Sequence, residues 1–333
     1  MRLGLIGLKG HQGEVLEGAR QLGTIELTAV ADDSPAALEN FKKAEPLARN
    51  AETYADWRHL LEHALIDVCC VCDDNQVRPE QLIALAKRHC HIVTEKPLAT
   101  TSSDLERIRL ALAKSKSRLT MLLTMRHEGK YMKMRKVVQA GAVGEVCQVT
   151  AQKSYQLGER PEWFKDRKRL GGTIPYIGIH VVDLMHWITG LAFSQVAAFH
   201  GRIGKPEMGE TENHASLLFR LSNGASATAR LDYLRPDTAP SHGDDRLRIA
   251  GSEGVIEVRG DEPMISLVTT SKKPHTIAPG SGGNFFVEFI HALQHERPVP
   301  VPTEDCLYIT EVVLKARDAA DQQKLIELDP KGK

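Results

Sequence analysis

Residues 1–125 carry the pattern that most constrains the fold, an alternation of short apolar runs with helical segments. In the helical segments, apolar residues recur every three or four positions, as on one face of an α-helix. Parallel strands need such crossover helices, so the alternation predicts β-α-β units in a doubly wound parallel sheet. The apolar runs are residues 2–8, 25–32, 66–72, 91–97 and 119–125, and the helical segments are 13–22, 34–44, 79–89 and 102–115.

After residue 123 the pattern changes to longer strands that are joined by short turns. Strands that cluster after a β-α-β region predict a second, α+β domain on a large, mostly antiparallel sheet. A chain of 333 residues is long enough for two cores, so we predict domains at 1–123 and 124–333. The expected strands are 144–155, 215–222, 225–234, 245–260 and 265–270, followed by helices at 284–296 and 304–322.

The charges balance, because Lys+Arg and Asp+Glu both total 43. Without a basic excess, binding to nucleic acid or to an anionic membrane surface is not expected. The first residues lack the apolar core and cleavage site of a signal peptide, and no apolar stretch approaches the roughly 20 residues of a membrane span. We therefore expect a cytoplasmic protein whose partners are small molecules.

Three of the six cysteines, Cys69, Cys70 and Cys72, share one apolar run. Cys69 and Cys72 spell C-x-x-C, but odd spacing on a strand sends their side chains to opposite faces. Core packing is therefore expected in place of redox or metal chemistry. No other spacing in the chain predicts a metal site, since H-x-x-D on one helix offers only two ligands.

A glycine-rich turn, "GLIGLKGHQG", follows the first apolar run. Glycine lets the backbone turn tightly and approach a pyrophosphate at a helix N-terminus. Counted from Gly7, the usual G-x-G-x-x-G spacing puts Lys9 at the second glycine, and Gly10 comes one residue late. The turn predicts dinucleotide binding, with a purely structural turn as the alternative.

The second apolar run ends in Asp32 and Asp33, about 20 residues beyond the glycines, where a ribose-binding carboxylate is expected. A carboxylate accepts hydrogen bonds from the ribose hydroxyls and repels a 2′-phosphate, so the pattern favours NAD over NADP. The alternative is that one of the aspartates caps the helix that follows.

Polar residues also follow the next two strands, where ligands gather in open α/β sheets. Asn75 comes after one strand, and Glu95, Lys96 and Pro97 end the other. Asn75 can bond a ribose or a carboxamide, and Lys96 can lie beside a nicotinamide. A turn residue and a surface ion pair are the alternatives.

In "GGTIPYIGIHVVD", a helix is expected to begin at Thr173 as its cap, with Pro175 in the first turn. Tyr176, His180 and Asp183 would share one helical face, because their spacings are four and three. Histidine exchanges a proton near neutrality, which alcohol oxidation requires. The alternative is a histidine packed in the core.

Together these motifs resemble the Gfo/Idh/MocA family of NAD(P)-dependent oxidoreductases. The points of match include "GLIGLKGH", "AVADD", "DDNQ", "TEKPLATT", "GAVGEV", "GGTIPYIGIHVVD" and "FFVEFIHALQHERPVPV", in the family's order over nearly the whole chain. The resemblance implies an N-terminal Rossmann domain, a C-terminal α+β domain that binds substrate and makes subunit contacts, and a homodimer or homotetramer.

The resemblance also implies roles for individual residues. Lys96 would lie between the nicotinamide and the substrate hydroxyl, and His180 would be the substrate-facing acid/base. Tyr176 stands where the inositol-dehydrogenase pattern has an aspartate, and it is a further catalytic candidate. Arg126, in "TMRH", would lie on the cofactor or substrate side. The residues expected at the cofactor are Gly7, Lys9, Gly10, His11, Asp32, Asp33, Asp73, Asn75, Glu95, Lys96 and Arg126.

Other polar residues could line a sugar pocket, although solvated surface is the alternative for them. They are Lys153, Tyr155, Trp163, Asp183 and His242. We therefore expect an NAD-dependent dehydrogenase or reductase that acts on a secondary hydroxyl of a sugar, sugar acid or cyclitol. The rival hypotheses are a nucleotide-binding regulator without turnover and an NAD-assisted glycosidase.

Overall fold

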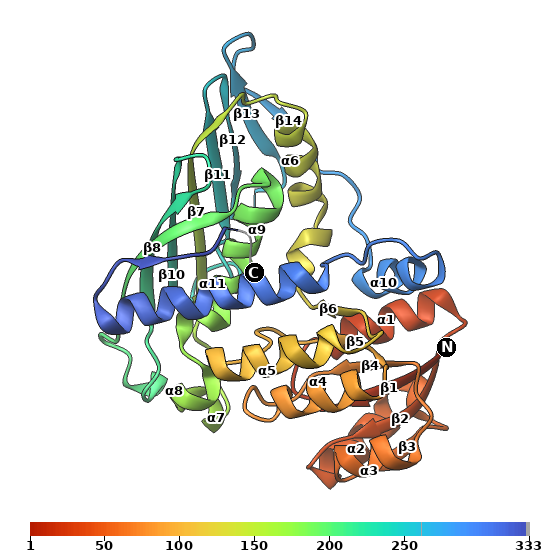
Figure 1. Ribbon diagram of the computed structural model, residues 1–333. Helices are drawn as coiled ribbons and strands as arrows, with labels where there is room; N and C mark the ends of the chain where they lie inside the picture. The colour runs from red at the N-terminus through yellow and green to blue at the C-terminus, as the bar shows by residue number, and fades with distance from the viewer. Residues whose placement is uncertain (261, 331–333) are drawn as a thin grey trace. The chain divides into compact units, whose positions relative to one another are not determined.

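The computed structural model describes residues 1–260 and 262–330 (Figure 1). Contacts divide the chain into two compact units, each with its own sheet. The first unit contains residues 1–122 and 283–307, and the second contains residues 123–282 and the stretch that begins at Tyr308. Among the described residues, no helix has both the length and the hydrophobicity that a membrane crossing needs.

The first unit is built on a six-stranded parallel sheet in the order β3-β2-β1-β4-β5-β6. Because β1 lies between β2 and β4, the chain winds outward from the centre in both directions, and the predicted doubly wound sheet is confirmed. The strands are β1 (Arg2–Ile6), β2 (Glu26–Ala31), β3 (Glu52–Tyr54), β4 (Val68–Val71), β5 (His91–Thr94) and β6 (Leu119–Met121).

Apolar runs form these strands because both faces of a parallel sheet are covered. Cys69, Cys70 and Cys72 are fully buried in and after β4, and burial raises the pKa of the Cys69 thiol well above its ordinary value. A buried neutral thiol is unreactive, in agreement with the expected core packing. The run expected as a strand to residue 125 stops at Met121, and a short 3₁₀ helix, Thr124–His127, follows.

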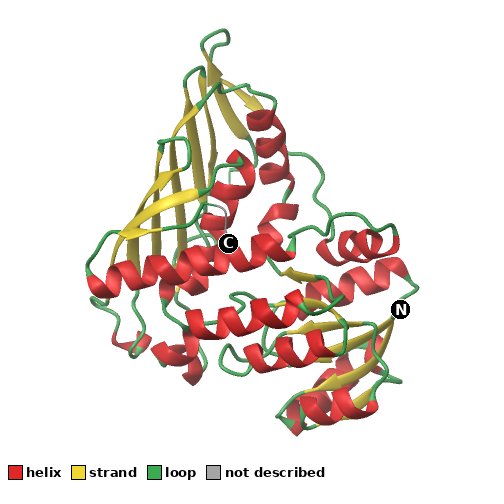
Figure 2. Ribbon diagram, viewed as in Figure 1, coloured by secondary structure: helices red, strands yellow, loops and turns green. Residues whose placement is uncertain are grey.

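Helices connect the strands of the first unit (Figure 2). One of them, α10, comes from the segment expected in the second domain. It packs on α1, where the Asn284 side chain donates to the Glu14 carbonyl at 3.2 Å. The lack of a side chain at Gly18 makes room for Asn284 and Phe286. The helices are α1 (Gln12–Leu22), α2 (Pro35–Ala44), α3 (Trp57–His63), α4 (Arg78–Lys87), α5 (Ser102–Ala113) and α10 (Phe285–Gln294).

The second unit is built on a nine-stranded sheet in the order β14-β13-β12-β11-β7-β10-β9-β8-β15. Its neighbouring strands are antiparallel except for β7 and β10, so the predicted, mostly antiparallel sheet is confirmed. The strands are β7 (Val146–Gln156), β8 (Phe193–Gly201), β9 (His214–Leu221), β10 (Ser226–Arg235), β11 (Arg246–Gly251), β12 (Gly254–Arg259), β13 (Ile265–Thr269), β14 (His275–Ile277) and β15 (Ile326–Glu327).

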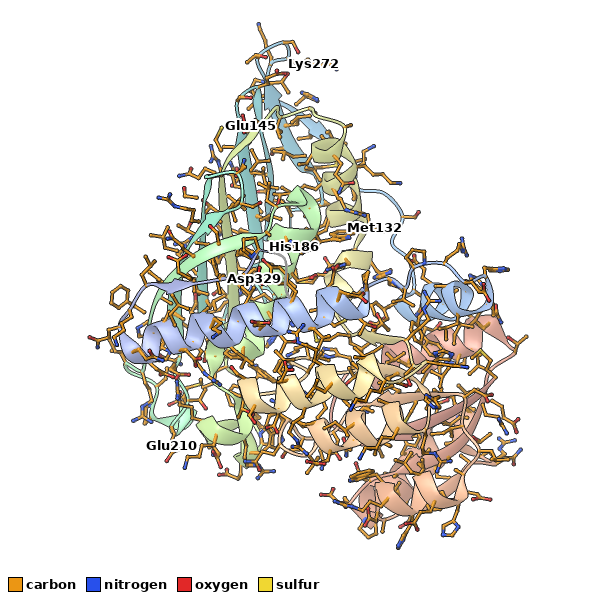
Figure 3. All side chains as sticks on the ribbon, in the orientation of Figure 1. Met132, Glu145, His186, Glu210, Lys272 and Asp329 are labelled. Atoms are coloured by element: carbon orange, nitrogen blue, oxygen red, sulfur yellow. The ribbon has the colours of Figure 1, made fainter. Side chains whose placement is uncertain are left out.

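One face of this sheet is apolar and carries helices, among them α6 (Gly129–Gln139) and α9 (Ile179–Thr189) (Figure 2). Alternate residues of β9 and β10 are buried, as expected for strands with one covered face. His186 of α9, labelled in Figure 3, bonds the Leu191 carbonyl at 2.9 Å and therefore has a structural partner. The remaining helices are α7 (Glu162–Lys165), α8 (Arg167–Leu170) and α11 (Thr303–Gln322), and the first residues of α11 belong to the first unit.

Candidate functional site

The turn after β1 depends on two glycines. Gly7 has φ 79°, and a Cβ there would lie 2.6 Å from the Asp73 Cα. A Cβ at Gly10 would lie 2.6 Å from the Glu95 Oε1. A larger residue at either position would collide with the loops after β4 and β5, so the glycines let this turn approach the carboxyl ends of neighbouring strands.

At the helix N-terminus that follows, His11 contacts the Glu95 carboxylate. His11 precedes α1, and both its backbone N–H and its Nδ1 lie within hydrogen-bond distance of the Glu95 Oε1, at 2.6 and 2.5 Å. Burial alone would raise the pKa of Glu95, but the bond from His11 and the charges of His11, Lys96 and Arg78 lower it to about 2. Glu95 is therefore an anion that fixes the turn, while its predicted contact with the cofactor stays a prediction.

Asp32 lies buried at the end of β2, 5% exposed. Its Oδ2 accepts from the Leu8 N–H and its Oδ1 from the Ser34 N–H, both at 2.9 Å. Ser34 is the residue that caps α2, through the bond from the Ala37 N–H to its Oγ, so the alternative that an aspartate caps this helix is wrong. The carboxylate is held instead against the glycine turn.

Lys9, which stands at the second glycine of the usual spacing, bridges two acidic side chains. Its Nζ lies 3.0 Å from carboxylate oxygens of both Asp33 and Asp73. Partial burial lowers the pKa of Lys9, but the two carboxylates outweigh it and the net shift is upward. Lys9 therefore stays charged and ties the turn after β1 to the ends of β2 and β4.

Arg78, at the start of α4, is a site residue that sequence reasoning missed. It is 3% exposed, and its guanidinium donates to the Asn75 Oδ1 at 2.6 Å and to the carbonyls of Asp73 and Pro97. These bonds fix the loops after β4 and β5 together. The signal in the sequence was an arginine that directly follows "DDNQV" at the start of a helix.

Lys96 follows β5 and is 5% exposed, and its backbone N–H donates to the Glu95 Oε2 at 3.1 Å. The predicted cofactor residues of the first unit, from Gly7 to Lys96, thus follow the carboxyl ends of β1, β2, β4 and β5. In a parallel sheet these ends form one edge, which is where open α/β sheets bind ligands. The groups present there fit a dinucleotide: a glycine turn and a helix N-terminus offer N–H donors, and a buried carboxylate is an acceptor.

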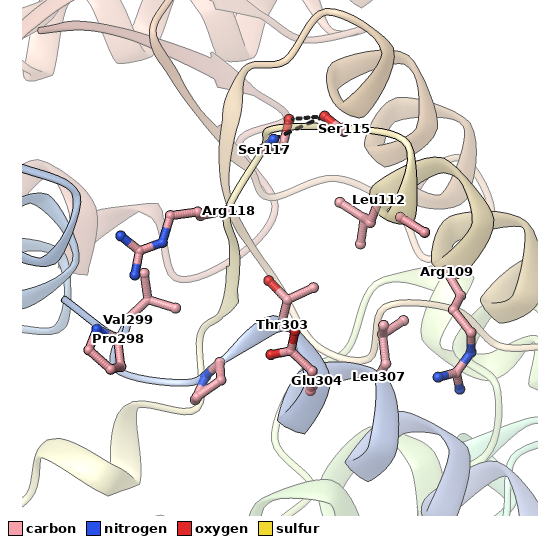
Figure 4. A pocket seen from close by; sticks show the side chains of 12 residues that line it. Arg109, Leu112, Ser115, Ser117, Arg118, Pro298, Val299, Thr303, Glu304 and Leu307 are labelled. Atoms are coloured by element: carbon pink, nitrogen blue, oxygen red, sulfur yellow. Dashed lines mark hydrogen bonds between the residues drawn. The ribbon is translucent and has the colours of Figure 1, made fainter. Parts of the chain in front are cut away.

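The first unit also has a pocket of about 530 Å³, whose lining residues Figure 4 shows. Ser115 and Ser117, whose hydroxyls are 2.8 Å apart, belong to the loop that enters β6 at its amino end. Arg118 also lines it and is bonded to the Ala292 carbonyl at 3.0 Å. The pocket is therefore distinct from the predicted dinucleotide residues.

In the second unit, Arg126 and Asp183 form a buried ion pair, with side chains 2% and 1% exposed. The Arg126 Nε lies 3.1 and 2.9 Å from the two carboxylate oxygens, and its Nη2 lies 2.5 Å from the Oδ1. The guanidinium also lies 5.6 Å from the Trp187 ring. The two residues, expected at cofactor and substrate, are paired with each other, and their predicted ligand contacts stay predictions.

The segment before His180 differs from the expected helix start. Thr173 makes no capping bond; its hydroxyl donates to the Glu212 carbonyl, so the predicted cap is wrong. Tyr176 lies in a π-helical turn, Ile174–Gly178, and α9 begins only at Ile179. Tyr176 and His180 therefore do not share one face of a regular α-helix. Such wide turns are frequent at functional sites, and His180, 8% exposed, lies in the first turn of α9.

A charged network holds the start of this turn. Glu212, 6% exposed, accepts from the Thr173 N–H at 3.1 Å and pairs with Arg167. Arg167 also contacts Asp321 at 2.7 Å, and His200 lies 3.2 Å from the same carboxylate. His200, Glu212 and Asp321 have donor atoms within 4.8 Å of one another, a spacing that a metal ion could bridge, but the Arg167 guanidinium supplies a positive charge there.

Three of the predicted pocket residues come together at the end of β7. Lys153 is buried, and its Nζ lies 2.5 Å from the Asp245 Oδ2 and 4.8 Å from the Tyr155 ring. Tyr155 stacks on His242 with the ring centroids 4.7 Å apart. Burial lowers the pKa of Lys153, but the neighbouring Tyr155 and Asp245 outweigh it, so the ammonium is charged.

Aromatic contacts join this group to the π-helical turn. The ring centroid of Tyr233, on β10, lies 6.2 Å from that of Tyr155 and 5.4 Å from that of Phe164. The ring centroids of Phe164 and Tyr176 are 5.8 Å apart. The rings of Trp163 and Tyr176 meet edge to face, with their centroids 6.2 Å apart. The structure thus connects the predicted residues Tyr155, Trp163 and Tyr176. Sequence reasoning missed Tyr233 and Asp245, and the only signal for them was polar residues near a strand end.

Two family models cover most of the chain. Residues 1–123 match an oxidoreductase family described by its NAD-binding Rossmann fold, and residues 131–257 match the GFO/IDH/MocA C-terminal domain. The myo-inositol 2-dehydrogenase of Thermotoga maritima is 25% identical over 77% of this chain and 74% of its own length. The inositol 2-dehydrogenase of Salmonella typhimurium is 24% identical over 61% of this chain, and the match spans 58% of that relative.

Solved structures share the fold. One from Thermotoga maritima is 34% identical, with a TM-score of 0.92 over 98% of this chain and 100% of that one. Levoglucosan dehydrogenase, solved with NADH and L-sorbose, is 17% identical, with a TM-score of 0.85 over 100% of both chains. At that identity the likeness concerns the fold alone.

Proposed function

Because this chain belongs to the Gfo/Idh/MocA family of oxidoreductases, we propose that it transfers a hydride between NAD and a secondary hydroxyl or ketone of a sugar, sugar acid or cyclitol. The observation that carries the proposal is the gathering of Gly7, Asp32 and Lys96 at one edge of the parallel sheet. That edge combines the elements of a dinucleotide site with a buried ammonium.

The first unit would hold NAD at this edge. The turn between Gly7 and Gly10 leads into α1, whose N-terminus suits a pyrophosphate, and Asp32 would accept hydrogen bonds from a ribose. NAD is proposed over NADP because Asp32 and Asp33 present carboxylates where a 2′-phosphate would need positive charge. Bound nicotinamide would supply the hydride acceptor or donor.

Lys96 and His180 would carry the proton chemistry. Hydride leaves the carbon of an alcohol as a proton leaves its oxygen, so a group must receive that proton. We propose that the Lys96 ammonium orients the hydroxyl and stabilises negative charge on its oxygen, and that His180 exchanges the proton. Tyr176 would bind the substrate, since a phenol is a poor base at neutral pH.

The test is Lys96→Ala, with the exposed Lys87→Ala of α4 as the matched control. We expect kcat/KM to fall about 1000-fold or more in the first variant and to stay unchanged in the control. NADH absorbance with cyclitols, aldoses and sugar acids gives the rates. Unchanged turnover in Lys96→Ala would contradict its role. Tight NAD binding without turnover would favour a regulator, and release of sugar from a glycoside without net NADH would favour a glycosidase.

We also propose that the chain forms a homodimer or homotetramer through the outer face of the nine-stranded sheet. On this face Phe199 of β8 and Leu218 of β9 are 72% and 53% exposed, and their strands are neighbours. Exposed apolar side chains on a sheet face favour association. Sedimentation should show an oligomer that Leu218→Glu weakens, and a monomer at micromolar concentration would contradict this proposal.

A further inference from the structure

One face of the large sheet changes from apolar to polar where β7 and β10 end. These strands are parallel neighbours, with Ser154 beside Asp232 in the register, so their carboxyl ends lie at the same edge. Alternation puts Ala151, Lys153 and Tyr155 on one face of β7, and the contact between Tyr155 and Tyr233 puts Tyr233 on the same face. We call Lys153, Tyr155, Tyr233, His242 and Asp245 the strand-end cluster.

Two buried polar atoms of the strand-end cluster have no partner among residues 1–260 and 262–330. They are the Tyr233 hydroxyl, on a side chain 1% exposed, and the Asp245 Oδ1. The other oxygen of Asp245 is taken by Lys153. Buried polar atoms are nearly always hydrogen-bonded, so two orphaned atoms in one cluster indicate that a ligand with hydroxyl groups completes it.

The charges of the strand-end cluster balance without an anion. The Lys153 ammonium is matched by Asp245 at 2.5 Å. Burial and the neighbouring charges of Arg160 and Lys153 lower the pKa of His242, which favours its neutral imidazole. Arg160 donates to the Leu157 carbonyl at 2.6 Å and lies over the rings of Phe164 and Tyr233.

The orphaned oxygen of Asp245 distinguishes between classes of ligand. A carboxylate oxygen accepts hydrogen bonds, so a hydroxyl can donate to it, whereas a second carboxylate has no proton to donate and is repelled. The Tyr233 hydroxyl can donate or accept. The stacked rings of Tyr155 and His242 add an apolar surface for the carbon skeleton of a ring.

We propose that the strand-end cluster binds a neutral polyhydroxylated substrate, with one hydroxyl donating to the Asp245 Oδ1 and a second bonded to the Tyr233 hydroxyl. The enzyme therefore prefers a neutral sugar or cyclitol to a sugar acid. This inference rests on the proposed function and narrows its substrate class.

The first test compares substrates that differ in one carboxylate, namely glucose with glucuronate and galactose with galacturonate, beside myo-inositol. We expect the fastest neutral compound to exceed every acid at least about tenfold in kcat/KM. An acid that reacts as fast as the neutral compounds overturns the inference and leaves the proposed function standing. NAD binding without oxidation of any compound overturns the proposed function itself.

The second test uses Tyr233→Phe and Asp245→Asn, with the neighbouring Asp244→Asn as the matched control, because the Asp244 carboxylate is held by Arg246 at 2.8 Å. Each cluster variant should raise KM for the fastest neutral substrate about 10- to 100-fold and leave the Kd for NAD unchanged. Tyr233→Phe removes only a hydroxyl, so it tests the proposal even if Asp245→Asn is unstable. Wild-type KM in Tyr233→Phe would overturn the inference.

Discussion

The polar groups at the carboxyl edge of the first unit and those of the strand-end cluster are satisfied in different ways. At the edge, Asp32 accepts two backbone N–H groups and Glu95 is bonded to His11. In the cluster, the Tyr233 hydroxyl and one Asp245 oxygen have no partner in the described parts of the chain. The first region is therefore organised by its own backbone, whereas the second needs a ligand to complete it.

The largest effect is expected at the buried Arg126–Asp183 pair of the second unit, which resembles the first region in being paired within the chain. Asp183→Asn leaves a buried guanidinium without its counter-charge, which should lower the free energy of unfolding by about 3–5 kcal/mol. Urea denaturation measures it. Asp318→Asn, at a more exposed pair, is the control and should cost below about 1 kcal/mol. Equal losses in both variants would contradict the prediction.

The next largest effect is expected on the pH dependence of the free energy of unfolding, through Glu95 of the first region. The pKa of Glu95 is about 2 in the folded chain, below its ordinary 4.5, so its contribution is present above pH 4.5 and is lost as the pH falls toward 2. The shift corresponds to about 3 kcal/mol. The Glu95→Gln variant should therefore have a lower free energy of unfolding than wild type at neutral pH. Its free energy of unfolding should also fall less than that of wild type on acidification.

Urea denaturation from neutral pH to about pH 3 checks this dependence. The exposed Glu62→Gln of α3 is the control and should follow the wild-type curve. Parallel curves for wild type and Glu95→Gln would show that Glu95 does not stabilise the turn.

A smaller effect is expected from Gly7→Ala, which tests whether backbone geometry organises the first region. The positive φ and the collision with Asp73 should cost about 1–3 kcal/mol and weaken NAD binding about tenfold. Gly13→Ala is the control, since a Cβ there meets nothing within 4 Å. Calorimetric titration with NAD measures the affinity. Equal affinities in the two variants would contradict the prediction that the backbone geometry at Gly7 is needed for NAD binding.

The smallest effect is expected from Asp33→Asn. This side chain is 77% exposed and its ion pair with Lys9 is near the surface, so its loss should change stability by less than about 1 kcal/mol. NAD affinity should change little, whereas Asp32→Asn should weaken it clearly. If NADP binds wild type as tightly as NAD, the proposed preference is wrong.

The sequence predicted those elements and site residues that depend on patterns within a short stretch of the chain. Alternating apolar and helical periods identified the parallel sheet, and a glycine turn followed by Asp32 indicated the edge where polar residues gather. Arg78 was missed because its partners lie on loops that follow two different strands. The strand β8 and the helix α6 also went unpredicted, since their apolar patterns are short and irregular.

The rest depends on contacts between distant segments. Spacing in "YIGIH" suggested one helical face, but packing of Leu231 against Gly178 accompanies a wide π-helical turn at Tyr176. Helix α10 joins the first unit through its contact with α1, which no local pattern reveals. Asp245 reaches Lys153 from 92 positions away, so only the folded sheet brings them together.

The parallel pairing of β7 and β10 has a kinetic consequence. Its two strands cannot be joined by a hairpin, so the chain must close a long loop before they meet. The aromatic contacts around Trp163 and Tyr176 form on segments within that loop. We expect tryptophan fluorescence to report a late step of refolding, after helices have already formed, because distant pairings are slow to assemble.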